Sequence, residues 1–467
     1  MPPVSPAMEI SYEPPWISVP SAPPAPPEDA HPPGPAPAGD RRPAPARQRR
    51  ALARRRFRAG AERGAVGRVP AVRQVRRLVV PVGALNPDAV RGRIVAAGAE
   101  MYDGVVSILD DRIADVIPFA EWVAAHPDSQ TPEFQGTILP GLVDIHNHGG
   151  YGNRFDTVDP DEARRAAEFH HRRGTTTLLA SVVTAPGDEM VAQVAMLRGL
   201  AEDGTIGGIH AEGPFLAEAR CGAQDPRYLC DPDPELTERL LTAAGGQLRV
   251  MTLAPERVGY DKVAQRLSDS GVVVSLGHSD TEFPRFRAAL RPNGFGSLVT
   301  HLANGMPPLH HRRPGPVAAG LVAAGDGDAI VELIGDGVHI DSGFGELVFA
   351  TAPGRVALIT DAMQAAGMPD GEYVLGPQQV TVTDGVARIA NGSIAGGTST
   401  LLDGVRWAAL ECGVPLRDAV CAASSVPAQA IGLTGVGDLR TGLFADLIVV
   451  DRDLRLRRVL RRGEWLS

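Results

Sequence analysis

Histidine and carboxylate residues recur in this sequence directly after short apolar runs. Six such sites are His146-Asn147-His148, His210-Ala211-Glu212, Gly277-His278-Ser279, Thr300-His301, Asp336-Gly337-Val338-His339 and Thr360-Asp361. One histidine at the end of a strand is more often structural than functional, but six such ends in one chain favour a shared metal site. Imidazole and carboxylate ligands suit Zn²⁺, and also Fe²⁺ or another first-row metal.

The spacing within these motifs indicates how the ligands can converge. Side chains at positions i and i+2 of a strand point to the same face, so His146 and His148 can share one divalent ion. Glu212 can bridge this ion to a second one, held together with His278 and His301. The sequence therefore predicts one or two divalent ions per subunit.

The elements that must position these residues alternate between short apolar strands and helical stretches, which is typical of parallel βα units. Eight strands are expected at 142–148, 175–183, 206–211, 248–253, 272–277, 297–300, 329–335 and 355–360. Candidate helices lie at 160–173, 187–202, 235–244, 261–270 and 342–352. This order predicts an α/β protein with a (β/α)₈ TIM barrel, whose active site lies at the carboxyl ends of the strands.

Strand-rich flanks on either side of this centre predict a second, smaller unit. We expect a small β-sandwich domain built from both ends of the region, with its first segment at 90–139 and its later segments at 371–395 and 430–467. The metal-dependent barrel is expected at 140–370, extending to about residue 430 with C-terminal helices.

Residues 1–89 are expected to form a separate extension rich in Pro, Ala and Arg. Residues 1–45 contain 16 prolines, and residues 41–77 contain 14 arginines with Glu62 as the only acid. Such a segment cannot bury enough apolar surface to offset its ordering entropy, so we expect disorder. An arginine run can bind nucleic acid, but we favour a solvated tail or a start codon placed too far upstream.

The overall composition predicts a cytoplasmic enzyme without a membrane or nucleic-acid partner. The chain has 467 residues, a formal net charge of −9 and four cysteines, none of them in a C-x-x-C pair. No apolar run reaches the roughly 18 residues of a membrane span, and no apolar signal core follows Met1. Lys262 is the only lysine and falls in a predicted helix. A carbamylated lysine bridge is therefore excluded, and with it most hydantoinase-like and dihydroorotase-like enzymes.

Taken in order, the motifs resemble those of the N-acetylglucosamine-6-phosphate deacetylases of the amidohydrolase superfamily. The resemblance covers about residues 91–467 and rests on segments 140–150, 210–215, 277–279, 300–307, 310–315, 336–339, 360–363 and 395–396. It implies that Glu212, His278 and His301 form the principal metal site. His146 and His148 match a further metal site, and both of its ligands are present here.

The resemblance also implies roles for the other residues of the site. Asp361 matches the catalytic acid/base, which takes a proton as water attacks the amide and returns it to the departing amine. Arg312 matches the phosphate-binding arginine. Contacts to the sugar are implied for Ala223, Gln224, Asn304, Gly305, Asp336, Gly337, Val338, His339, Ile394, Ala395 and Gly396. A homodimer, with the phosphate pocket near the subunit interface, is implied as well.

Four positions depart from the family pattern. Gln224 stands where the family usually has a histidine, and Arg313 replaces a usual acid beside Arg312. Gly305 stands where alanine is usual, and Gly397 where serine is usual. None of these changes removes a metal ligand or the acid/base, so we expect metal-dependent hydrolysis of the acetamide of N-acetylglucosamine 6-phosphate, in amino-sugar catabolism or cell-wall recycling. The alternatives are an N-acetylgalactosamine-6-phosphate deacetylase, an enzyme for another N-acyl substrate, and a non-catalytic protein of the same fold.

Overall fold

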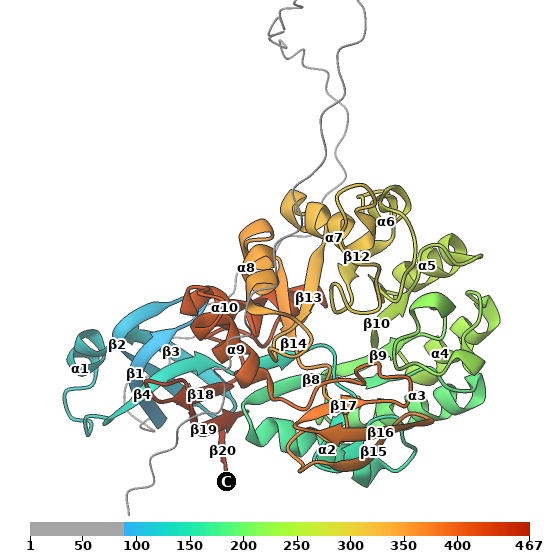
Figure 1. The fold of residues 1–467 in the computed structure, drawn as a ribbon. Helices are drawn as coiled ribbons and strands as arrows, with labels where there is room; N and C mark the ends of the chain where they lie inside the picture. The colour runs from blue at the N-terminus through green and yellow to red at the C-terminus, as the bar shows by residue number, and fades with distance from the viewer. Residues whose placement is uncertain (1–87) are drawn as a thin grey trace, which may run out of the picture. The chain divides into compact units, whose positions relative to one another are not determined.

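An eight-stranded parallel sheet forms the centre of the computed structural model, which describes residues 88–467 (Figure 1). Its strands are hydrogen-bonded in chain order: β5 (Leu142–Asp144), β8 (Thr175–Val182), β9 (Gly208–Glu212), β10 (Leu248–Leu253), β11 (Val273–Leu276), β12 (Gly296–Val299), β13 (Ile330–Ile334) and β14 (Val356–Ile359). All eight strands expected from the sequence are present, and the α/β fold class is confirmed. The extension expected at 1–89 lies outside the described residues, except for its last two positions.

Several helices between these strands begin where the sequence supplies a capping side chain. Asp159, Asp233 and Asp341 each precede a helix and accept the backbone N–H two residues further on, which satisfies a donor that the helix leaves free. The five expected helices are α2 (Pro160–Arg172), α3 (Gly187–Glu202), α4 (Pro234–Ala244), α5 (Tyr260–Asp269) and α8 (Ser342–Thr351). The helices that were not expected individually are α6 (Phe283–Ala289), α7 (Gly315–Asp326), α9 (Leu401–Leu410), α10 (Leu416–Ala422) and α11 (Ser425–Ala430). Within residues 88–467, no helix combines the length and apolarity that a membrane span requires.

Both ends of the described chain meet in one seven-stranded sheet (Figure 1). Its order is β20 (Glu464–Leu466), β19 (Leu456–Arg461), β18 (Leu447–Val450), β4 (Phe134–Pro140), β1 (Asp88–Val95), β2 (Glu100–Leu109) and β3 (Arg112–Pro118). A short helix, α1 (Phe119–Ala125), follows β3. Strand β4 joins the two halves of the sheet, because it pairs in parallel with β1 and antiparallel with β18.

The segment at 371–395, expected to join this flanking domain, forms a sheet of its own. Its three strands are β15 (Gly371–Leu375), β16 (Gln378–Thr383) and β17 (Val386–Arg388). Apolar residues of β15–β17 pack in one cluster with Val183 and Met363, which follow β8 and β14. Apolar contact therefore holds this small sheet at the carboxyl edge of the central sheet, where the candidate ligands lie, and strand pairing does not link it to the flanking sheet.

Candidate metal centre

Two groups of metal-ligating side chains lie at the carboxyl ends of the central strands. We name them the principal group (Glu212, His278 and His301) and the second group (His146, His148 and Asp361), and the ligand atoms within each group lie within 4.8 Å of one another. Strand β9 ends in a residue of the principal group, and β5, β11, β12 and β14 are followed within four residues by the other members. The structure thus brings together six residues that are separated by up to 215 positions in the chain.

Glu212 lies between the two groups. Its Oε1 is 3.0 Å from Nε2 of His278 and 2.9 Å from Nε2 of His301. Its Oε2 is 3.3 Å from Nε2 of His148 and 3.6 Å from Nε2 of His146. One carboxylate therefore presents a different oxygen to each group, which is the arrangement that a bridging ligand requires.

Asp361 is the member of the two groups that solvent reaches most easily. Its side chain is 13% exposed, whereas the side chains of the other five are at most 6% exposed. Oδ1 lies 3.1 Å from Nε2 of His148 and 3.4 Å from Nε2 of His146. Burial raises the pKa of this carboxyl, but the two imidazoles outweigh burial and lower the pKa to about 2. Asp361 is therefore ionised at neutral pH and can accept a proton.

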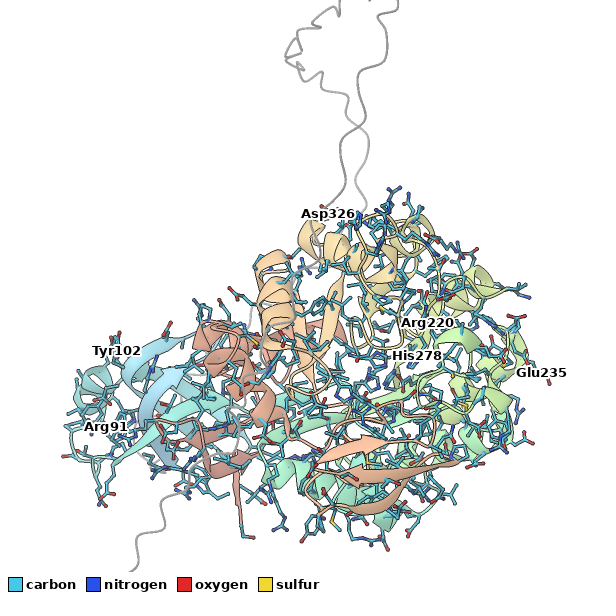
Figure 2. The ribbon with its side chains drawn as sticks, viewed as in Figure 1. Arg91, Tyr102, Arg220, Glu235, His278 and Asp326 are labelled. Atoms are coloured by element: carbon cyan, nitrogen blue, oxygen red, sulfur yellow. The ribbon has the colours of Figure 1, made fainter. Side chains whose placement is uncertain are left out.

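The hydrogen bonding of His278 tests whether these residues fit a cation. Its Nδ1 lies 2.7 Å from the carbonyl oxygen of Arg220, and the two residues are labelled beside each other in Figure 2. A carbonyl can only accept, so Nδ1 carries the proton and Nε2 presents a lone pair. That lone pair faces a carboxylate oxygen of Glu212, and two acceptors at this distance need a proton or a cation between them. The donor set therefore fits a divalent ion.

Three residues of the two groups have backbone conformations that L-amino acids rarely adopt. The φ angles are +47° at His278, +24° at His301 and +48° at Asp361. Such conformations cost on the order of 1–3 kcal/mol each and are most often retained at functional sites. Backbone contacts hold two of them: the N–H of Asp361 donates to the carbonyl of His146 at 3.0 Å, and the carbonyl of His278 accepts from Ala217 at 3.0 Å.

Two residues expected to contact the sugar lie against the metal groups. Nε2 of Gln224 donates to Oε2 of Glu212 at 2.7 Å, and its Oε1 accepts the N–H of Thr184 at 2.8 Å. Both amide atoms of Gln224 are thus engaged within the protein. Gly305 lies against the ring of His278, because a Cβ at position 305 would stand 2.9 Å from Nδ1 of that ring. Glycine in place of the usual alanine is therefore compatible with a closer approach of this loop.

The remaining expected contacts surround the two groups. Nδ2 of Asn304 is buried without a hydrogen-bond partner among the described residues, so it is free to donate to a ligand. The turn at 394–396 lies beside Asp361, whose carbonyl accepts the N–H of Gly397 at 2.7 Å, and Ala223 packs against the β15–β17 cluster. In the 336–339 loop, Asp336 accepts the Nδ1–H of His339 at 2.6 Å together with two backbone N–H groups. This fixes the loop that carries Gly337 and Val338.

Arg312 and Arg313 differ in their surroundings. Arg312 is exposed and contacts the neighbouring ring of His311 at 2.8 Å, so the described residues do not place it against the metal groups. Arg313 forms an ion pair with Glu282 at 3.1 Å, so a neighbouring carboxylate balances the positive charge that this arginine adds.

The sequence did not single out Glu332, and it gave His210 no clear role. Glu332 is fully buried in the middle of β13, and its Oε2 lies 3.2 Å from Nδ1 of His146. The available signal was an acid inside an otherwise apolar strand, because buried carboxylates are rarely left unpaired. His210 uses both ring nitrogens on hydroxyl groups, those of Ser181 and Thr252 at 2.9 Å each, so its role is structural.

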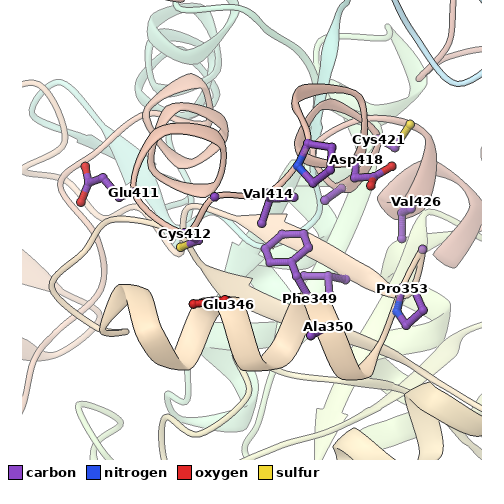
Figure 3. Close-up of a pocket in the computed structure, with 15 residues that line it drawn as sticks. Glu346, Phe349, Ala350, Pro353, Glu411, Cys412, Val414, Asp418, Cys421 and Val426 are labelled. Atoms are coloured by element: carbon purple, nitrogen blue, oxygen red, sulfur yellow. The ribbon is translucent and has the colours of Figure 1, made fainter.

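A separate cavity of about 500 Å³ lies between α8, α10 and the loop that joins α9 to α10 (Figure 3). Its lining includes Phe349, Cys412, Val414 and Val356. Val356 is the first residue of β14, whereas the metal groups lie beyond the last residue of that strand. The cavity is therefore at the opposite edge of the central sheet and takes no part in the metal centre.

Comparison with known proteins identifies the family of this arrangement. A model described as the amidohydrolase family matches residues 137–466. This chain belongs to the amidohydrolase family. It is 34% identical to N-acetylglucosamine-6-phosphate deacetylase of Vibrio furnissii, over 78% of this chain and 86% of the relative. It is 35% identical to N-acetylgalactosamine-6-phosphate deacetylase of Escherichia coli O157:H7, over 77% of this chain and 96% of the relative.

Solved structures give the same result. The crystal structure of N-acetyl-D-glucosamine-6-phosphate deacetylase from Mycobacterium smegmatis is 38% identical to this chain and superposes with a TM-score of 0.76, over 81% of this chain and 100% of the other. A mutant of that enzyme has been solved in complex with N-acetyl-D-glucosamine-6-phosphate. The resemblance that the motifs implied is confirmed, as is the expectation of a hydrolase.

Proposed function

We propose that this amidohydrolase removes the acetyl group of N-acetyl-D-glucosamine 6-phosphate, giving D-glucosamine 6-phosphate and acetate, in amino-sugar catabolism or cell-wall recycling. The observation that carries the proposal is the placement of Glu212, which presents one oxygen to each metal group. Beside it stands Asp361, an ionised carboxylate that solvent reaches. The names of the relatives support the choice of substrate.

Glu212, His278 and His301 would hold the principal ion, and His146 and His148 would hold a second one with Asp361 beside them. Zn²⁺ fits this set of imidazole and carboxylate donors best, and Fe²⁺ or another first-row ion is compatible with it. When bound, such an ion polarises the amide carbonyl and makes water a better nucleophile at neutral pH.

Asp361 performs the proton transfers of the reaction. As a carboxylate with a depressed pKa, it takes a proton from the attacking water. It then delivers this proton to the amide nitrogen, which leaves poorly unless it is protonated. Positioned proton transfer of this kind contributes about 10²–10⁴-fold to the rate.

The sugar and its phosphate are bound by groups around the metal centre. The unpartnered Nδ2–H of Asn304 and the ring of His339, which Asp336 holds in place, are donors for sugar oxygens. Arg312 offers a planar guanidinium that can clamp two phosphate oxygens at once. Its exposure suits a phosphate pocket at the edge of the subunit, and we propose a homodimer on this ground and on the family resemblance.

The galacto epimer is the second candidate substrate. It is favoured by the 35% identity to the deacetylase of Escherichia coli O157:H7 named for N-acetylgalactosamine 6-phosphate. The two sugars differ only in the configuration at C4, so the proposed contacts to the acetamide and the phosphate do not distinguish them.

We also propose the finer architecture and location of the protein. The central strands form a closed (β/α)₈ barrel, supported by two backbone hydrogen bonds just beyond β5 and β14: Asp361 N–H to His146 at 3.0 Å and His148 N–H to Ala362 at 2.7 Å. The seven-stranded sheet is the separate β-domain at 90–139 and 430–467. A phosphorylated sugar substrate suits a cytoplasmic enzyme.

The test is acetate release by the full chain reconstituted with Zn²⁺. N-acetylglucosamine 6-phosphate, its galacto epimer and unphosphorylated N-acetylglucosamine are compared at equal concentration. We expect turnover of the phosphorylated gluco sugar, and a loss of about 10²–10⁴-fold in Asp361→Asn with its ions retained. Faster turnover of the epimer would select the second candidate, and no acetate from any sugar by the Zn²⁺-loaded chain would refute both.

A further inference from the structure

Glu332 makes two contacts that connect the metal groups. Its Oε2 accepts the backbone N–H of His301, in the principal group, at 3.1 Å. The same oxygen lies 3.2 Å from Nδ1 of His146, in the second group. The side chain has no exposure to solvent, so solvent does not compete for these contacts.

The contact with His146 decides which nitrogen of this ring carries the proton. Oε2 of Glu332 already accepts the N–H of His301, and the same oxygen accepts from His146, so Nδ1 of His146 is the donor. In the neutral ring the lone pair is then on Nε2, which lies 3.0 Å from Nε2 of His148 and 3.4 Å from Oδ1 of Asp361. Glu332 thus fixes the tautomer in which His146 can act as a ligand, as carboxylates behind metal-binding histidines commonly do.

The contact with His301 takes the place of backbone pairing between β12 and β13, which ends before His301. Strands β12 and β13 pair as far as Val299 and Val331, after which the chain turns with a φ of +24° at His301. Beyond that point Glu332 accepts two N–H groups, that of His301 on its side chain at 3.1 Å and that of Leu302 on its carbonyl at 2.9 Å. The same residue therefore anchors the turn that carries a principal ligand.

We propose that Glu332 is the positioning residue of His146 and controls whether the second group binds an ion. The inference rests on the proposed function only in that both metal groups are taken to bind ions, and it names a determinant of the second ion that the resemblance did not supply. Outer partners of metal ligands typically affect affinity about 10–100-fold. The loss should fall mainly on the second ion, because only the second group uses a side chain that Glu332 orients.

The experiment is a Zn²⁺ titration of the metal-free full chain against a competing chelator, with bound metal counted by mass spectrometry. Glu332→Gln keeps the shape and an acceptor oxygen but removes the charge. Asp446→Asn is the matched control, because Asp446 is a buried carboxylate in the flanking β-domain that accepts the N–H of Arg462 at 2.7 Å. A third variant, His146→Asn, and the double variant with Glu332→Gln test whether the two residues act together.

We expect Glu332→Gln to bind the first Zn²⁺ as the wild type does and the second about 10-fold or more weakly, and Asp446→Asn to bind both normally. In the double variant, Glu332→Gln should add nothing to the loss caused by His146→Asn. Wild-type affinities and stoichiometry in Glu332→Gln would overturn the proposal, as would losses that add in the double variant. Because the readout is metal binding, it is independent of acetate release. If the variants bind Zn²⁺ as expected but the Zn²⁺-loaded wild type releases no acetate, the proposed function alone is refuted.

Discussion

Replacing Gln224 with methionine should destabilise the protein by several kcal/mol, because this one amide satisfies two buried groups. Its Nε2–H donates to the carboxylate of Glu212 at 2.7 Å, and its Oε1 accepts the N–H of Thr184 at 2.8 Å. Methionine has a similar length and fills a similar volume, but it neither donates to the carboxylate nor accepts strongly from the amide. The substitution therefore removes the hydrogen bonds with little change in packing.

The magnitude follows from the kind of each bond. A hydrogen bond to a charged group contributes about 1.5–3 kcal/mol, and a buried N–H left without an acceptor costs about 1–3 kcal/mol. Together they predict that Gln224→Met lowers the free energy of unfolding by about 2.5–6 kcal/mol. The histidine that the family usually has at this position lacks the amide group that makes both contacts. In this chain, Gln224 therefore helps to hold the carboxylate of Glu212 in place.

Urea unfolding of the metal-free chain measures the effect, with the midpoint expected to fall and the slope to stay unchanged. Gln265→Met is the control: Gln265 is exposed on α5, and surface substitutions of this kind change stability by no more than about 0.5 kcal/mol. A loss below about 1 kcal/mol in Gln224→Met would refute the reasoning, since it would mean that Glu212 and Thr184 find other partners at little cost.

Two further predictions concern phosphate recognition and pH. Arg312→Lys keeps the charge but loses the planar, two-pronged geometry of the guanidinium, so kcat/KM for the phosphorylated sugar should fall about 10-fold or more. The control is Arg313→Lys, at the neighbouring position, which should leave kcat/KM unchanged. Equal losses in the two variants would contradict the assignment of Arg312 to the phosphate. Burial raises the pKa of Asp156 to about 6, partly offset by Arg154 and His148. The folded state therefore holds this proton more tightly, and stability falls as pH rises from about 4 to 6. Asp156→Asn should remove the dependence and gain up to about 3 kcal/mol at pH 8 with none at pH 4; a gain of the same size at both pH values would contradict it.

The central sheet could be predicted from the sequence because its strands are buried on both faces. In the sequence, such strands are nearly continuous apolar runs. Polar residues that directly follow them lie together at the carboxyl edge of the sheet. This is why Glu212, His278, His301 and Asp361 could be found from the sequence alone. The i, i+2 spacing added His146 and His148 without knowledge of the rest of the fold.

What the sequence could not supply depends on contacts between distant segments. Gln224 is 12 positions from Glu212, and Glu332 is 186 from His146, and no local pattern links either pair. Helix α7 (Gly315–Asp326) was missed because glycine and alanine make up most of its buried residues, so it lacks the periodic large apolar side chains that mark a helix. The strands β15–β17 were expected to join the flanking domain, but they form their own sheet beside the central sheet. Their alternating apolar residues show that one face is buried but not which surface it covers.

The seam between the first and last central strands links the stability of the fold to its chemistry. Oδ2 of Asp144 accepts from Nδ2 of Asn147 at 3.0 Å and from Oγ1 of Thr360 at 2.6 Å. Each donor is flanked by residues of the second group: Asn147 lies between His146 and His148, and Thr360 precedes Asp361. One buried carboxylate at this seam therefore helps to hold the carboxylate of Asp361 beside the two imidazoles. The unfavourable φ of Asp361 can persist there, because relaxing it would break hydrogen bonds that also hold the two strands together.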